Sequence, residues 1–382
     1  MSRTLRIAML SHSTNPRGGV VHAMQLSEAL TALGHEVVLH APDATGTGFF
    51  RTPACSTVCI PVEPAPGDMA AMVEQRIDDY VRHFDNPAAR DFDIFHAHDG
   101  ISGNALATLK QRGLLPAFAR TVHHIDQFSD PRLMALQNRS IDRADLFFTV
   151  SAMWRKTLEA RGLRSTVVGN GVDVSRFSPD VDPVALRQKL NLPEGPVFLA
   201  VGGIEERKNT LAMLDAFRQL RAIRPDAQFV IAGGASLLDH RGYQGEFRST
   251  LAALGEHAAA VHILGTIADA DMPALYRLAD TLAFASVKEG FGLVVLEAMA
   301  SGVPVVVSSI APFTEYLRSG DAIWCDPANP ASIAEAMAVS LNPALRGRLI
   351  SHGLKVAVRH SWQRTAAAHL SAYETLKEPA HA

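Results

Sequence analysis

Two glutamates eight positions apart are the residues best placed to do chemistry in this chain. Glu289 opens the sequence Glu-Gly-Phe-Gly, and Glu297 follows an apolar run. Gly290 and Gly292 allow the backbone to approach a ligand closely, and free amides at a helix start suit a phosphate group. A helix that begins near Gly292 places Glu297 in its second turn and leaves Glu289 in the preceding loop. Both carboxylates could then face one cleft and accept hydrogen bonds from sugar hydroxyls. The alternative is a pair of solvated surface acids.

A second candidate lies in a charged segment. Residues 196–201 are typical of a buried strand that ends at Gly202-Gly203, and the charged sequence 205–209 follows it. The ammonium group of Lys208 could there stabilise a diphosphate leaving group while a sugar bond breaks. A charged turn of this kind is otherwise usually a solvated loop.

Two further loops follow expected strands. Gly18 and Gly19 could present bare backbone amides to a phosphate or an acceptor at a helix start, although a structural turn is the alternative. Neither half of the chain has the glycine spacing of a dinucleotide-binding fingerprint, which argues against a nicotinamide enzyme. His123 ends another expected strand and could hold a sugar hydroxyl, while His124 must point to the opposite face. A buried structural histidine is the competing interpretation.

The sequence does not predict a metal site. His96 and His98 share one face of an expected strand, but no nearby residues complete a ligand set with suitable spacing. Two Asp-x-Asp sequences, at 91–93 and 180–182, lie before a strand and in a linker. We therefore expect no metal ligands.

An alternation of strands and helices must position these loops. Residues 20–33 have apolar side chains near helical spacing, and Gly34 stops the helix. Nearly continuous apolar strands separated by helices predict parallel sheets covered on both faces, with ligands bound at the carboxyl ends of the strands. The alternation occurs once in each half of the chain. The expected strands are 6–10, 36–41, 93–98, 120–123, 146–150, 196–201, 229–232, 261–264, 281–285, 303–307 and 322–325.

The segment 289–305 closely resembles the donor-binding signature of retaining glycosyltransferases of glycosyltransferase family 4, also called group 1. Asn170-Gly171-Val172-Asp173, Arg176-Phe177-x-Pro179 and Ser361-Trp362-Gln363-Arg364 are similar to further parts of that family. The resemblance implies an α/β fold of the GT-B architecture, in which two doubly wound Rossmann-like domains face each other across a cleft. We expect an acceptor-side domain at 1–169, a linker at 170–194 and a donor-binding domain at 195–360. A helix at 361–377 should pack back on the first domain.

The resemblance also implies roles for individual residues. Glu289 would bind hydroxyls of the transferred sugar, and Glu297 would hold the nucleotide ribose. Lys208 would neutralise the leaving diphosphate. The expected catalytic residues are thus His123, Lys208 and Glu289. The expected donor-binding residues are Gly18, Gly19, Arg207, Lys208, Glu289, Gly290, Phe291, Gly292, Leu293 and Glu297.

One position departs from the family pattern. The family usually has an arginine directly after the glycine that closes the strand before Lys208, and this chain has Gly203 there. Arg207 could supply the missing guanidinium group from the loop, or the second cation could be absent.

The function implied is a metal-independent, retaining transfer of a hexose from a nucleotide-diphosphate sugar to an acceptor hydroxyl. The leaving phosphate would accept the proton of the acceptor during attack on the same face of the sugar. No cofactor is expected, and a UDP-sugar is favoured over a GDP-sugar. The acceptor is a glycan, a lipid or a small molecule. The alternatives are a nucleotide-sugar epimerase of the same architecture and a non-catalytic nucleotide-sugar-binding protein.

The composition agrees with such an enzyme. A length of 382 residues suits two domains, and the net charge of −3 does not favour nucleic-acid binding. Three cysteines cannot form a disulfide framework, which favours the cytoplasm. The first residues soon become polar, so we predict neither a signal peptide nor a membrane span there. The sequence leaves peripheral membrane contact open.

Overall fold

The computed structural model describes residues 3–65, 67–234 and 240–376 of the chain. The chain divides into two compact units. The first comprises the residues up to Asn170 together with those from Trp362 onward, and the second is Gly171–Ser361. The predicted helix at 361–377 includes residue 377, which lies outside the described residues.

The first unit is built on a sheet of seven parallel strands in the order β3-β2-β1-β4-β5-β6-β7. Apart from Arg6 at the start of β1, its central strands β1, β4 and β5 consist of buried residues, as expected for strands covered on both faces. The strands are β1 (Arg6–Leu10), β2 (Glu36–Asp43), β3 (Ser56–Pro61), β4 (Ile94–Ala97), β5 (Ala119–Val122), β6 (Leu146–Thr149) and β7 (Thr166–Val167).

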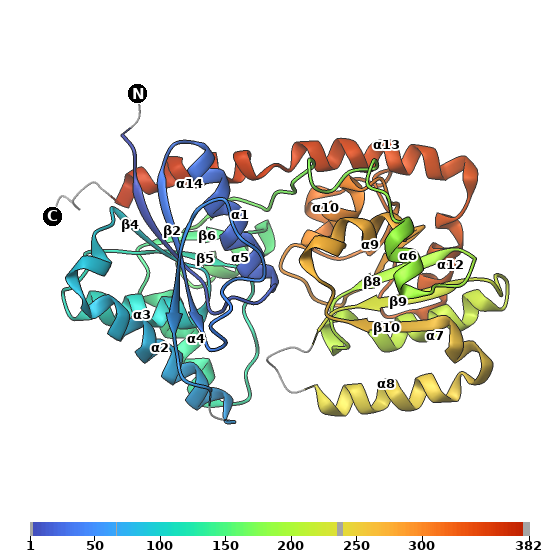
Figure 1. Cartoon of the computed structure of the whole chain (residues 1–382), viewed down its shortest axis with the longest axis horizontal. Coiled ribbons are helices and arrows are strands. Elements are labelled where there is room, and N and C mark those ends of the chain that lie inside the picture. The colour runs from blue at the N-terminus through green and yellow to red at the C-terminus, as the bar shows by residue number, and fades with distance from the viewer. Residues whose placement is uncertain (1–2, 66, 235–239, 377–382) are drawn as a thin grey trace. The chain divides into compact units, whose positions relative to one another are not determined.

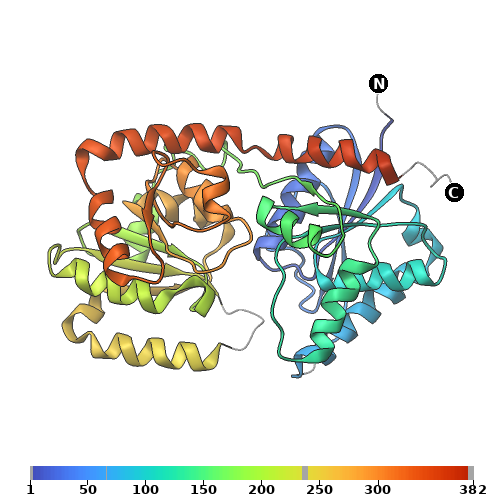
Figure 2. The same cartoon turned by 180° about the vertical axis from the view of Figure 1, so that it is seen from behind.

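Helices cover both faces of this sheet (Figures 1 and 2). The helices α2 (Met69–Asp85), α3 (Gly100–Gln111) and α4 (Pro131–Asp142) pack in sequence on one face, with α1 (Gly18–Ala32) and α14 (Trp362–Tyr373) on the other. The helix α5 (Ala152–Glu159) follows β6. Their starts are encoded locally. The carboxylate of Asp99 accepts a hydrogen bond from the Ser102 amide at 2.8 Å and caps α3, which fixes where β4 gives way to helix.

The helix α14 belongs to the first unit although it lies far along the chain. It packs on α1, and the hydroxyl of its Tyr373 hydrogen-bonds to Nδ1 of His96 on β4 at 2.6 Å. The Trp362 ring contacts the His22 ring edge-on, with centroids 5.2 Å apart. The chain enters and leaves the second unit at neighbouring points, since the Val172 amide donates to the His360 carbonyl at 2.8 Å.

Five imidazole rings, four of them from buried residues, link α1, α14 and the carboxyl ends of β4 and β5. We call His22, His96, His98, His123 and His369 the histidine cluster. The closest ring pairs are His96 with His98, at 4.3 Å between centroids, and His22 with His123, at 4.7 Å. Nδ1 of His22 hydrogen-bonds to the Asn170 side-chain oxygen at 2.7 Å. Burial lowers the pKa of every ring in the cluster, so these histidines are neutral at pH 7.

The second unit has a six-stranded parallel sheet in the order β10-β9-β8-β11-β12-β13. Its strands are β8 (Val197–Val201), β9 (Gln228–Ala232), β10 (Val261–Gly265), β11 (Thr281–Phe284), β12 (Val305–Ser308) and β13 (Ile323–Cys325). The helices α7 (Thr210–Arg221), α8 (Arg241–Ala253) and α12 (Pro330–Ser340) lie on one face. On the other face lie α9 (Met272–Leu278), α10 (Leu293–Ala300) and α13 (Pro343–Arg359), with α6 (Val184–Leu190) against α9. The short helix α11 (Phe313–Tyr316) follows β12.

The predicted fold class is confirmed, because both units are doubly wound parallel α/β structures. Two strands were not predicted from the sequence. The strand β3 lies at the sheet edge and exposes three of its six residues, and both residues of the edge strand β7 are exposed. Edge strands of this kind lack the continuous apolar pattern of the central strands, so the criterion used for those strands misses them.

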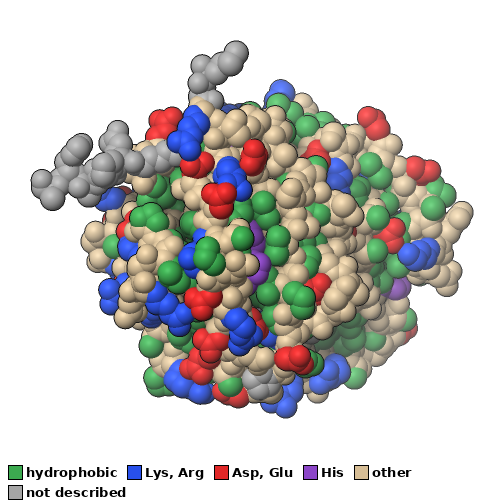
Figure 3. All heavy atoms as spheres, turned by 60° about the vertical axis from the view of Figure 1, so that its left-hand side comes forward, with side chains coloured by type: hydrophobic (Ala, Val, Ile, Leu, Met, Phe, Trp, Pro, Cys, Tyr) green, Lys and Arg blue, Asp and Glu red, His purple; other side chains and the backbone are tan. Residues whose placement is uncertain are grey.

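Neither the described helices nor the face in Figure 3 has the features of a membrane-spanning or strongly charged protein. None of the described helices combines the length and apolarity needed to cross a bilayer. On the face shown in Figure 3, acidic and basic side chains are interspersed.

The histidine cluster should make the first unit lose stability in acid. Burial lowers the pKa of His22 to about 4 and that of His369 to about 3, from an ordinary value of 6.5. Below pH 6.5 the unfolded chain therefore binds protons that the folded chain does not. At pH 5 each of these two histidines should reduce the free energy of unfolding by roughly 2 kcal/mol relative to neutral pH.

Denaturant unfolding at pH 7.5 and pH 5 measures this effect. His369→Phe should flatten the pH dependence whatever its absolute stability, because it removes one buried base. His124→Gln is the matched control, since the His124 side chain is 59% exposed. Identical pH dependences for the wild type and His369→Phe would contradict the prediction.

Candidate functional site

In the second unit, charged side chains lie together at the point where the strand order of the sheet reverses. From β8 the chain proceeds to β9 and β10 on one side, whereas β11, β12 and β13 lie on the other side. Ligands of doubly wound sheets bind beside such a switch point, at the carboxyl ends of the strands. Lys208 follows β8 in a 3-10 turn, Glu206–Lys208, and Glu289 lies in the loop between β11 and α10.

Lys208 and Glu289 form a buried ion pair. The Lys208 ammonium donates to Oε1 of Glu289 at 2.6 Å, and the two side chains are 12% and 8% exposed. The ammonium also lies 4.5 Å from the centre of the Phe284 ring. Burial alone raises the pKa of Glu289, but Lys208 and Arg207 outweigh it and the pKa is lowered. Burial lowers the pKa of Lys208, and Glu289 opposes that shift.

Glycine at position 202 allows Lys208 to reach this position. Gly202 has a φ of +142°, and a Cβ there would lie 2.9 Å from Cε of Lys208. Any side chain would therefore be strained at this backbone conformation and would displace the lysine. The glycine in the turn after β8 thus leaves space for the Lys208 side chain to reach Glu289.

Arg207 joins the same cluster. Its Nη1 lies 3.3 Å from Oε1 of Glu289, and its Nε lies 3.0 Å from Oε2 of Glu205. Glu205 is 5% exposed, whereas the Arg207 side chain is 45% exposed. A buried carboxylate therefore holds a guanidinium group whose outer part remains open to solvent. We call Glu205, Arg207, Lys208 and Glu289 the charged cluster.

The arginine expected at position 203 has no room. A Cβ on Gly203 would lie 2.8 Å from the Gly234 carbonyl oxygen and 2.9 Å from Oε1 of Glu205. The first contact is with backbone, which cannot move away like the end of a flexible side chain. The departure from the family pattern therefore has a local steric cause.

Next to the charged cluster, the start of α10 presents a row of backbone amides. Gly292 is the N-cap with a φ of +93°, and a Cβ there would lie 2.6 Å from the Phe313 ring. Within the described part of the chain, the amides of residues 290–294 donate no hydrogen bond. Phe291 is buried and stacks on Tyr316, with centroids 4.6 Å apart. This stack fixes the loop that carries the amides.

Glu297 lies on α10 in a different polar environment. The Tyr276 hydroxyl donates to its Oε2 at 2.6 Å, and burial raises the pKa of Glu297. Near it, Arg176 forms a salt bridge with Asp269 at 2.8 Å. Glu205 and Tyr276 were not among the residues predicted from the sequence. No sequence signal marks Tyr276, while Glu205 stands in the charged segment but is distinguished only by its burial.

The remaining candidate residues lie in the first unit. Gly18 and Gly19 are the first two residues of α1, and His123 follows the end of β5. A Cβ on Gly19 would lie 3.5 Å from Cδ2 of His123, an ordinary contact, and nothing lies within 4 Å of such an atom on Gly18. The structure therefore brings Gly19 and His123 together in one unit, and Arg207, Lys208 and Glu289 together in the other.

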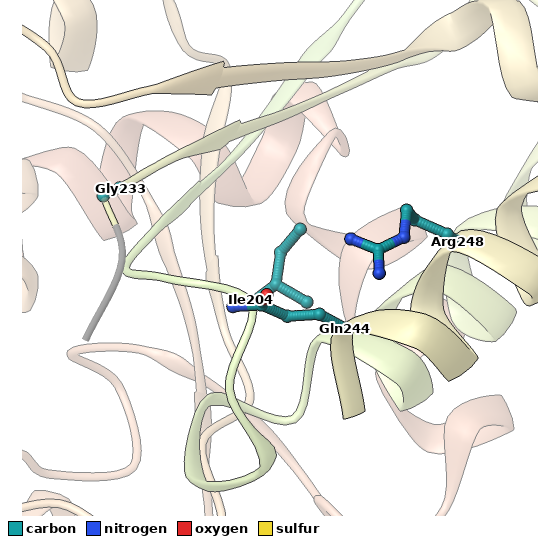
Figure 4. Close-up of a pocket in the computed structure, with 5 residues that line it drawn as sticks. Ile204, Gly233, Gln244 and Arg248 are labelled. Carbon is teal, nitrogen blue, oxygen red and sulfur yellow. The ribbon is translucent and has the colours of Figure 1, made fainter. Parts of the chain in front are cut away.

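A pocket of about 200 Å³ lies in the second unit, also at the carboxyl ends of the strands. Ile204 and Gly233-Gly234 contribute to it from the loops after β8 and β9, and Gln244 and Arg248 contribute from α8 (Figure 4). Neither Lys208 nor Glu289 lines it, so it is a neighbour of the charged cluster rather than the cluster itself.

Known proteins resemble both halves of the chain. Residues 184–355 match the family model for glycosyl transferases group 1, and residues 16–176 match that for glycosyltransferase family 4. The phosphatidyl-myo-inositol mannosyltransferase of Mycobacterium leprae (strain TN) is 28% identical over 384 residues, which cover 97% of each chain.

Two solved structures share the fold. Sucrose-phosphate synthase from Thermosynechococcus elongatus matches with a TM-score of 0.79 at 22% identity, over 97% of this chain and 98% of that one. The Anabaena protein HepE, in complex with UDP and glucose, matches with a TM-score of 0.77 at 19% identity, over 98% of this chain and 100% of that one. Because the two family models together span most of the sequence and both units are doubly wound parallel α/β structures like the two domains of a GT-B fold, the chain belongs to the group 1 and family 4 glycosyltransferases and is an enzyme of that kind.

Proposed function

We propose that this glycosyltransferase moves a hexose from a nucleotide-diphosphate sugar to an acceptor hydroxyl, with retention at the anomeric carbon and without a metal ion. The observation that carries the proposal is the buried Lys208–Glu289 pair, 2.6 Å apart, beside the free amides at the start of α10. It combines a cation, hydrogen-bond donors and a carboxylate at the switch point of one sheet. A diphosphate needs the first two, and a sugar hydroxyl needs the third.

The diphosphate would be bound by Lys208 and by the amides of residues 290–294. Helix-start amides favour negative charge, and a buried ammonium acts more strongly than an exposed one because water does not screen it. As the bond to the sugar breaks, charge builds up on the leaving phosphate. These fixed donors would stabilise it without reorganising. They would supply the positive charge that a metal ion supplies in other transferases.

Glu289 would hold the transferred sugar, and Glu297 the ribose. The lowered pKa of Glu289 keeps it ionised at neutral pH, so it can accept hydrogen bonds from hydroxyls. Glu297 accepts one bond from Tyr276 at Oε2, which leaves Oε1 for a ribose hydroxyl. Tyr276 would thereby orient the carboxylate.

The proton of the acceptor would pass to the leaving phosphate during attack on the same face of the sugar. The protein then needs no dedicated base, and its contribution is positioning and charge stabilisation. Gly18, Gly19 and His123 complete the proposed set of residues.

The proposed donor is a UDP-sugar ahead of a GDP-sugar, and no further cofactor is required. The structure of HepE contains UDP and glucose, which supports a uridine donor. The relative from Mycobacterium leprae is named as a mannosyltransferase acting on a phosphatidyl-inositol, which supports a lipid or polyol acceptor. We further propose a cytoplasmic location, in keeping with free thiols at Cys55, Cys59 and Cys325.

Product analysis with a panel of nucleotide sugars and acceptors, in the presence of EDTA, tests this proposal. We expect release of the nucleoside diphosphate together with a glycosylated acceptor. The transferred hexose should have the same anomeric configuration in this product as in the donor. Conversion of the donor to its epimer would instead favour the epimerase. Donor binding without turnover, across the whole acceptor panel, would favour the non-catalytic alternative. An activity abolished by EDTA and restored by a divalent cation would contradict metal independence.

Lys208→Ala should lower kcat/KM for transfer by about 100- to 1,000-fold, the loss typical for one preorganised donor at a developing anion. The change leaves the buried Glu289 with only its longer contact to the half-exposed Arg207, which destabilises the fold. Lys208→Ala/Glu289→Gln therefore serves as a second variant without the stranded charge. Lys355→Ala, an exposed lysine of the same unit, is the control. Near-normal kcat/KM in both Lys208 variants would refute the proposed role.

Arg207 is proposed to replace the arginine absent at position 203. Arg207→Ala should weaken binding of a nucleoside diphosphate by about tenfold and that of the monophosphate much less, because a half-exposed guanidinium contributes modestly. Glu205→Gln should act in the same direction by loosening Arg207. Gly203→Arg should not rescue Arg207→Ala, because position 203 has no room beside the Gly234 carbonyl. Equal affinities of Arg207→Ala and the wild type for the diphosphate in calorimetry would show that no second cation is needed.

A further inference from the structure

Two buried residues connect to His123 through its ring nitrogen. Nε2 of His123 lies 3.2 Å from Nδ1 of His98, and Nε2 of His98 lies 2.8 Å from Sδ of Met9. His98 is 2% exposed and Met9 is fully buried. The chain of contacts thus runs from the core of the first sheet, at β1, through the end of β4 to the end of β5.

Burial determines how many protons the rings of His98 and His123 carry. Burial lowers the pKa of both His98 and His123 well below its usual value, so each ring carries one proton at neutral pH. A neutral imidazole has one nitrogen that donates and one that accepts. A thioether sulfur can only accept, so the contact with Met9 requires the proton of His98 to be on Nε2.

The position of the proton on His98 determines the position of the proton on His123. With its proton on Nε2, His98 has a bare Nδ1 that can only accept, so His123 must donate to it from Nε2. Nδ1 of His123 is then the bare nitrogen. The opposite arrangement would turn the bare Nε2 of His98 towards the sulfur lone pairs of Met9. It would leave a buried acceptor without a donor, which is costly.

The bare nitrogen is also the accessible one. Nδ1 of His123 makes no hydrogen bond to the described residues and is not among their fully buried, unpaired side-chain atoms. Gly19 covers the opposite edge of the ring, because a Cβ there would lie 3.5 Å from Cδ2 and 3.9 Å from Nε2 of His123. His22 packs edge-on against the same ring, with centroids 4.7 Å apart.

We propose that Met9 and His98 are positioning residues that hold His123 with its proton on Nε2, so that Nδ1 accepts a hydrogen bond from a substrate hydroxyl. The nature of the substrate rests on the proposed function, but the proton assignment does not. A bare nitrogen attracts a hydroxyl and disfavours a phosphate or carbonyl oxygen, neither of which can donate. Two buried residues would thereby set which substrate group His123 prefers.

Nuclear magnetic resonance of the full chain labelled with ¹⁵N-histidine tests the assignment without any substrate. The resonances of His123 are identified by their loss in His123→Asn. The expected wild-type pattern at pH 7.5 has the proton on Nε2. Met9→Leu keeps the volume but removes the acceptor, so it should shift His98 and His123 towards a mixture of tautomers. Met24→Leu, another buried methionine of the first unit, should leave the pattern unchanged.

A proton on Nδ1 of wild-type His123 would overturn the proposal. It would equally fail if neither Met9→Leu nor His98→Phe altered the His123 pattern. Should the expected pattern appear while no donor supports glycosyl transfer, the proposed function fails and the proton assignment stands.

Kinetics test the consequence for the substrate. His98→Phe should lower kcat/KM for transfer by roughly three- to tenfold, the loss expected for one neutral hydrogen bond. If the hydroxyl belongs to the transferred sugar, donor hydrolysis without acceptor should fall in parallel. If it belongs to the acceptor, hydrolysis should be unchanged and the KM of the acceptor should rise. Unchanged transfer in His98→Phe and His123→Asn would refute the positioning role.

Discussion

The burial of an ion pair between Lys208 and Glu289 is the constraint on which the second unit depends. Removing two charges from water costs several kcal/mol for each ion, and only close geometry recovers that cost. The 2.6 Å contact supplies this geometry, and Arg207 adds a further opposite charge to Glu289. Such a pair is a poor device for stability alone. Under the proposed function, its value would be to hold a cation for the diphosphate and a carboxylate for the sugar side by side.

Glycine residues make the arrangement of the charged cluster possible. Gly202 leaves a passage for the Lys208 side chain, and Gly292 lets the loop after Glu289 pass the Phe313 ring. Gly203 lies against the Gly234 carbonyl and leaves no room for a side chain there, and the guanidinium group that contacts Glu289 belongs to Arg207. The electrostatics of the charged cluster and the glycine positions are therefore two aspects of one solution. A change in either would disturb the other.

The sequence allowed prediction of those features that depend on neighbours along the chain. The central strands are continuous apolar runs, and the segment at Glu289 combines glycines with a helix start, so both could be recognised. The strand β3 could not, because its pattern is that of a half-exposed edge. Glu205 and Tyr276 escaped prediction because their importance arises from contacts with residues elsewhere in the chain. Likewise, His22 meets Asn170 across 148 positions and His96 meets Tyr373 across 277. The roles assigned to the site residues stay predictions.

The division of the chain has a consequence for how the molecule is made. The second unit is one uninterrupted stretch, whereas the first needs residues from Trp362 onward to cover α1 and His96. On the ribosome, the sheet that emerges first must wait for its covering helix until the whole inserted unit has been synthesised. The second unit can thus reach its native state while the first is still partly open. The order of translation and the order of maturation are therefore opposite, and the nascent protein carries an uncovered imidazole-rich face until α14 has been synthesised.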